Sequence, residues 1–149
     1  LAVMEISSLK LRMGFRLGVY TIDKVVEWVT SEIGKADEPS NELLDLSLAT
    51  TKGVHDTYSA LYELNDSPEN DIVLIDTLSE IHISDLNNIK FCRDLAQKLY
   101  TYYVDQNYEV NSQLSEIGFF DDGYDLAMQG ITETVEEWHE RFKEFIKNC

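Results

Sequence analysis

ETVEEWHERFKEFIK, residues 133–147, places apolar side chains at intervals of three or four residues: Val135, Trp138, Phe142 and Phe145. This is the spacing of one face of an α-helix. Carboxylates dominate its first turns, whereas Arg141, Lys143 and Lys147 come later, and the helix macrodipole favours that order of charges. The segment therefore predicts an amphipathic helix at the end of the sequence, with one face packed on a core.

Similar periodicity extends over much of the chain. Ile22 to Ile33 carries an apolar stripe behind Thr21, whose side chain can cap a helix, and Ser40 can cap a short leucine-rich helix after it. Residues 54–62 give another helical pattern, and Ile89 to Tyr103 gives a long one. These segments predict helices joined by short connections.

The tetrapeptide Asp66-Ser67-Pro68-Glu69 contains the strongest start signal. Ser67 supplies a capping hydroxyl, Pro68 suits the first turn of a helix, and Glu69 adds a favourable carboxylate. We expect a helix from Pro68 to about Ile83.

Evidence for strands is thin, because the apolar run Ile72–Ile75 lies inside a longer helical period and has no hairpin turn beside it. The expected fold is all-α: a single-domain bundle of roughly six to eight helices over residues 1–149, with irregular antiparallel packing. Residues 1–20 form a basic N-terminal segment, with Lys10, Arg12 and Arg16 against Glu5. The sequence leaves open whether this segment packs as a helix or only loosely.

Charge excludes several function classes. The 149 residues include 28 acidic and 12 basic side chains, a net charge of −16, which repels nucleic acid and anionic membranes and attracts cationic partners. The two cysteines form no CxxC pair, and this usage fits reduced thiols. No apolar run is long enough to cross a membrane. Without the pattern of a secretory signal peptide at its start, the sequence predicts a cytoplasmic protein.

Catalytic and metal-binding motifs are incomplete. Glu136-x-x-His139 matches half of a di-iron carboxylate motif, but no second pair exists. Residues 121–125, DDGYD, lack the alternating ligands and closing glutamate of a calcium loop, and His82 lies in a pattern expected to leave it half-buried. We predict no catalytic residue, cofactor or metal, and no enzymatic activity. A pocket without a motif, built from His82, Asp76 and a tyrosine, remains an alternative.

Partner binding is the remaining candidate function. The segment 63–85 holds seven carboxylates and no lysine or arginine, and half of all tyrosines fall at 100–108. Tyrosine is enriched at the centre of protein interfaces. We expect Tyr100 and Tyr103 to be the more buried tyrosines and Tyr102 and Tyr108 the more exposed. The predicted partner-binding residues are Glu63, Asp66, Glu69, Asp71, Asp76, Glu80, Tyr102 and Tyr108.

Asp66-Ser67-Pro68-Glu69 and Tyr102-Tyr103, in a small acidic helical chain, resemble fragments of the bacterial immunity proteins that neutralise cationic nuclease toxins, including the nuclease-colicin immunity family. The resemblance implies an immunity-like or antitoxin-like inhibitor that presents acids and tyrosines to a basic toxin.

Two alternatives to partner binding stay open. The acidic surface can serve solubility alone, since a run of charges is often just a solvated face. The chain can also be a structural or regulatory protein that self-associates, for example as a homodimer, by burying Val135, Trp138, Phe142 and Phe145 against a second copy.

Overall fold

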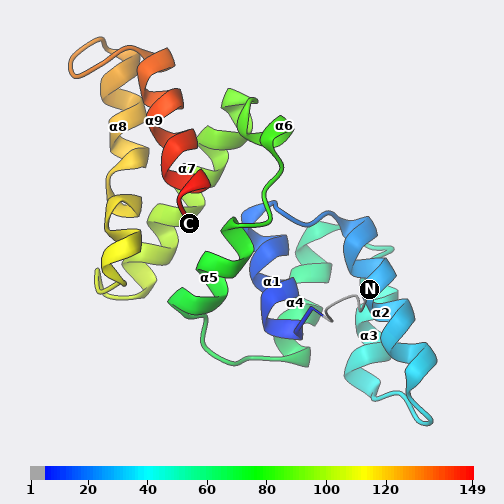
Figure 1. Ribbon diagram of the computed structural model, residues 1–149. Helices are drawn as coiled ribbons and strands as arrows, with labels where there is room; N and C mark the ends of the chain where they lie inside the picture. Colours follow the sequence, from blue (N-terminus) through cyan, green and yellow to red (C-terminus); the bar gives the residue numbers. More distant parts are fainter. Residues whose placement is uncertain (1–5) are drawn as a thin grey trace. The chain divides into compact units, whose positions relative to one another are not determined.

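Polar side chains at the helix starts fix where the helices begin. The computed structural model describes residues 6–149 (Figure 1). The side chains of Thr21 and Ser40 accept hydrogen bonds from the backbone N–H groups of Lys24 and Leu43, as the sequence predicts. Thr134 accepts from Glu137 N, and the Glu137 carboxylate accepts from Thr134 N, which completes a capping box before the terminal helix.

All regular structure within residues 6–149 is helical, so the all-α expectation is confirmed. The number of helices is larger than expected, because short elements join the longer ones. The helices are α1 (Ser8–Leu17), α2 (Ile22–Lys35), α3 (Asn41–Ala49), α4 (Val54–Leu64), α5 (Asp71–Leu78), α6 (Ile83–Leu86), α7 (Ile89–Asp105), α8 (Phe120–Met128) and α9 (Val135–Lys147), with a 3-10 helix, η1 (Ser112–Gly118), between α7 and α8.

The chain divides into two compact units, the first ending at Val73 and the second beginning at Leu74, inside α5. In the first unit α1 packs against α2 and α4, and α3 packs against the same two helices. In the second unit α7 contacts α6, η1, α8 and α9. The expectation of a single domain stays a prediction.

The N-terminal segment packs as a helix from Ser8 onward. Leu11 and Met13 of α1 are fully buried, and Leu11 belongs to the core of the first unit. The other buried members of that core are Phe15, Tyr20, Val25, Val29, Leu43, Leu46 and Leu61. Residues 1–5 of the predicted basic segment lie outside the described residues.

One buried arginine ties α1 to the segment that follows α4. The Arg12 side chain donates to the carbonyl oxygen of Asn65 and, from Nη2 over 2.6 Å, to that of Ser67. Glu69 Oε1 lies 3.9 Å from Arg12 Nε, and Glu69 Oε2 accepts from Arg16 Nη1 at 2.8 Å. Arg12 is only 2% exposed, so these interactions form where water screens them little.

This cluster explains why the predicted helix from Pro68 to Ile83 is wrong. Residues 65–70 are not helical, because the Arg12 guanidinium binds two backbone carbonyls there and Glu69 turns to Arg16. Helix α5 begins three residues after Pro68, at Asp71, where the Asn70 side chain accepts from Val73 N. It ends at Leu78, and α6 is a separate short helix.

The apolar face of the terminal helix is covered within the second unit. Trp138 and Phe142 are fully buried and stack at 5.3 Å, and Trp138 Nε1 donates to the carbonyl oxygen of Phe120. Phe145 is half-buried, with its ring 5.2 Å from that of Phe120. The expected amphipathic helix is therefore confirmed. The chain's own side chains cover Trp138 and Phe142 of this face, and self-association through the face stays a prediction.

Loss of the Arg12 guanidinium should destabilise the first unit. We expect Arg12→Lys to lower the free energy of unfolding by about 2 kcal/mol or more, because an ammonium group cannot bond both carbonyl oxygens in the same geometry. Urea denaturation measures the change, and hydrogen exchange should place it in α1 and α4. Lys35→Ala, which removes an exposed pair with Glu32, is the control and should cost less than about 0.5 kcal/mol. An equally small effect of Arg12→Lys would contradict the account.

A pair of glycine variants tests a tight contact at Gly118, with Gly34 as the control. A Cβ at Gly118 would lie 2.5 Å from Tyr103 Cε2, so Gly118→Ala should destabilise by about 1–3 kcal/mol. A Cβ at Gly34, in α2, meets nothing within 4 Å, so Gly34→Ala should be neutral or stabilise by up to about 1 kcal/mol. Thermal unfolding of the two variants gives the comparison, and a neutral Gly118→Ala would disprove the tight contact.

Candidate functional site

The predicted acidic residues are divided between the two compact units. Glu63, Asp66, Asp76 and Glu80 are exposed, whereas Asp71 is half-exposed. Asp76 and Glu80 belong to the second compact unit and the others to the first. A run of acids along the sequence is thus divided between two units of the structure.

Glu69 is not available to a partner in the way we predicted. Its side chain is only 9% exposed, and its carboxylate binds Arg16 inside the first unit. The reason is that Arg12 and Arg16 approach Glu69 from α1, more than fifty residues away in the sequence.

Tyr102 is the second correction, because it is 1% exposed rather than accessible. It follows Leu95 and Leu99 on the inward face of α7, at the spacing of one helix face. Tyr108 is 61% exposed, as expected, and its ring meets that of the half-buried Tyr103 edge-on at 5.4 Å. The structure therefore retains one exposed tyrosine of the two predicted.

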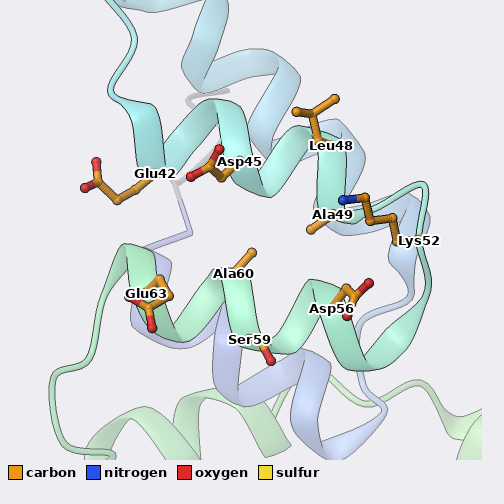
Figure 2. Close-up of a pocket in the computed structure, with 9 residues that line it drawn as sticks. All are labelled: Glu42, Asp45, Leu48, Ala49, Lys52, Asp56, Ser59, Ala60 and Glu63. Atoms are coloured by element: carbon orange, nitrogen blue, oxygen red, sulfur yellow. The ribbon is translucent and has the colours of Figure 1, made fainter.

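Glu63 lines a groove between α3 and α4, which we call the acidic groove (Figure 2). Its volume is about 400 Å³. Figure 2 shows Ala49 of α3 and Ala60 of α4 pointing toward one another across the groove, where small side chains leave space. The groove is lined by Glu42, Asp45, Leu48, Ala49, Lys52, Asp56, Ser59, Ala60 and Glu63.

The turn between α3 and α4 positions the two walls of the groove. Gly53 has a φ of 118°, a conformation that residues with a Cβ rarely adopt, and it lets the chain reverse within a few residues. The buried Thr57 hydroxyl donates to the carbonyl oxygens of Gly53 and Ala49, at 2.7 and 3.3 Å. The start of α4 is thereby fixed to the end of α3.

The acidic groove carries excess negative charge. Four carboxylates line it, from Glu42, Asp45, Asp56 and Glu63, against the single ammonium group of Lys52. Within residues 6–149, none of these four carboxylates takes part in an ion pair or side-chain hydrogen bond. The four carboxylates are therefore unpaired, Lys52 offsets only part of their charge, and the excess can act on a ligand.

A second depression, which we call the tyrosine hollow, adjoins the groove on α4. It is lined by His55, Tyr58, Ser59, Tyr62 and Glu63, and its volume is also about 400 Å³. Ser59 and Glu63 line both depressions, so they form a ridge between them. A ligand that crosses this ridge would contact carboxylates on one side and tyrosine rings on the other.

The sequence analysis missed Glu42, Asp45, Asp56 and the two tyrosines Tyr58 and Tyr62. The signal lay in two helical patterns with acids three or seven residues apart, on either side of the turn at Gly53. Each pattern alone describes a solvated helix face. Only the pairing of α3 with α4 turns the two faces into the walls of one groove.

The remaining candidates for chemistry are separate. His139 Nε2 donates to the carbonyl oxygen of Leu86 over 2.7 Å, whereas Glu136 is exposed. His82 is exposed rather than half-buried. Burial raises the pKa of Asp121, and the neighbouring carboxylates of Asp125 and Asp122 raise it further.

Within residues 6–149 no three histidine, cysteine or acidic side chains are arranged to hold a metal ion. Nor does any helix in that range have the length and apolar character needed to cross a membrane.

Comparison with known proteins gives no relative. The chain matches no protein-family model, no curated protein and no solved structure. A function must therefore be inferred from the shape and charge of the acidic groove and the tyrosine hollow.

The two thiols should react slowly, because burial raises the pKa of both Cys92 and Cys149 to about 11. A pKa two units above the ordinary value of 9.0 leaves about one-hundredth of the usual thiolate at pH 8. We expect alkylation by iodoacetamide about 100-fold slower than for free cysteine, rising with pH up to about pH 11. Mass spectrometry follows the reaction, and urea should restore the ordinary rate. A plateau of the rate below pH 9 would contradict the raised pKa values.

Proposed function

We propose that this protein binds a basic protein partner through the acidic groove, and that it acts in the cytoplasm as an immunity-like or antitoxin-like inhibitor of a toxin. The observation that supports this most is the set of four carboxylates on α3 and α4 that have no basic partner in the described part of the chain. Lysine and arginine side chains of a partner would supply the missing countercharges.

Charge at this site acts at two stages of binding. The net charge of −16 attracts a cationic protein from a distance and raises its association rate at low salt. In contact, Glu42 and Asp45 face the partner from α3 while Asp56 and Glu63 face it from α4. Inhibition follows if the partner's basic surface is the one that it uses on its own target, because the groove then covers it. The proposed role is binding without catalysis.

The alternative is that the acidic surface serves solubility alone. It requires that removing charge at one place have the same effect as removing it at another. The proposal instead assigns a distinct role to the groove, so charge-matched variants separate the two.

A capture experiment at two salt concentrations tests the proposal. The tagged chain should retain a basic protein of its source lysate in stoichiometric amount at about 50 mM salt and lose most of it at about 500 mM, since screening weakens charge pairs. The triple variant Glu42→Gln, Asp45→Asn, Asp56→Asn should retain at least about tenfold less, which corresponds to about 1.4 kcal/mol.

The control removes three charges elsewhere. Asp94, Glu109 and Glu136 are exposed residues of the second unit, and their amide variants should retain the partner as well as the unchanged protein does. Quantitative mass spectrometry compares the three baits. Equal losses in both triple variants would refute a role for the groove and leave only a general effect of charge.

A further inference from the structure

The tyrosine hollow has a different chemistry from the groove beside it. The groove offers carboxylates and small side chains, whereas the hollow offers the rings of Tyr58 and Tyr62, the imidazole of His55 and the carboxylate of Glu63. Tyr58 and Tyr62 are one helical turn apart on α4, so both rings lie on the same face. The hollow therefore combines aromatic surface with one negative charge.

The ring of Tyr62 already binds a guanidinium group on its inner side. Arg12 Cζ lies 5.2 Å from the ring centroid, and Arg12 is 2% exposed, so this contact is inside the protein. Tyr62 itself is 48% exposed, which leaves its outer side open to the hollow. An aromatic ring has two negative faces, and an external cation can take the second one.

Glu63 supplies the charge that such a cation needs. It follows Tyr62 directly, lines the hollow, is exposed and has no ion pair within residues 6–149. A planar guanidinium can stack on a ring and present its N–H groups to a carboxylate at the same time, whereas an ammonium group is compact and more strongly hydrated. The hollow thus favours arginine over lysine.

We propose that the tyrosine hollow binds one arginine side chain of the basic partner, stacked on Tyr62 and paired with Glu63, while neighbouring basic residues of the same segment lie in the acidic groove. This inference rests on the proposed function, because it places the same partner. The ridge of Ser59 and Glu63 is shared by both depressions, so a short stretch of chain can reach them together.

Two peptides of equal charge, hepta-arginine and hepta-lysine, test this inference. Calorimetry in about 20 mM salt, where screening is weak, gives both dissociation constants for each protein variant. The unchanged protein should bind hepta-arginine more tightly. Tyr62→Leu, which keeps apolar cover over Arg12, should reduce the ratio of the two affinities about threefold, the size of an exposed cation–π contact. Phe119→Leu, at an exposed aromatic residue of the second unit, should leave the ratio unchanged.

Exposed Glu63 provides a second variant that does not disturb the core. Glu63→Gln should weaken hepta-arginine binding more than hepta-lysine binding, while Glu109→Gln should affect neither. An affinity ratio that is the same in the unchanged protein, Tyr62→Leu and Glu63→Gln would overturn the arginine site and leave the groove intact. Failure of the unchanged protein to bind either peptide would overturn the proposed function as well.

Discussion

The first unit depends on a single buried cation. Arg12 lies within the protein, and its guanidinium binds the carbonyl oxygens of Asn65 and Ser67 that follow α4. A buried charge is costly unless it is paired and hydrogen-bonded, and Glu69 supplies a nearby carboxylate at 3.9 Å. The same guanidinium lies under the ring of Tyr62. One side chain therefore joins α1 to α4, holds residues 65–69 in a non-helical conformation, and supports the ring that lines the tyrosine hollow.

The candidate site follows from how two short helices pair. A tight turn at Gly53 and the hydroxyl of Thr57 join α3 to α4, and the small residues Ala49 and Ala60 leave a space between them. Carboxylates line that space because they lie on the solvent side of each helix. There they stay hydrated, so no desolvation cost arises. Since no base of the described chain pairs with them, their charge is available to a cationic ligand. Packing within the unit thus creates the surface on which the proposed function rests.

Local rules predicted the helices well. Thr21, Ser40 and the Trp138 face of α9 follow from capping and from apolar spacing, which depend on a few neighbouring residues. One failure involves distant partners, and another overlooked the spacing within a single helix. Ser67-Pro68-Glu69 is a good helix start in isolation. In the folded chain, however, Arg12 and Arg16 bind this segment in a non-helical conformation. Tyr102 was assigned to a surface because it lies among tyrosines, although its place after Leu95 and Leu99 puts it in the core. The groove could not be predicted, because α3 and α4 form it only after they pair.

The most direct test of the account is to locate a basic ligand on the protein by NMR. Hepta-arginine would be titrated into the isotopically labelled full chain at low salt, and changes in amide chemical shift would be followed for each residue. The account predicts that the largest changes fall in α3 and α4, at Glu42, Asp45, Asp56 and Glu63 and around Tyr62. Changes of equal size over all exposed carboxylates, or largest changes in the second unit, would contradict a binding site in the acidic groove.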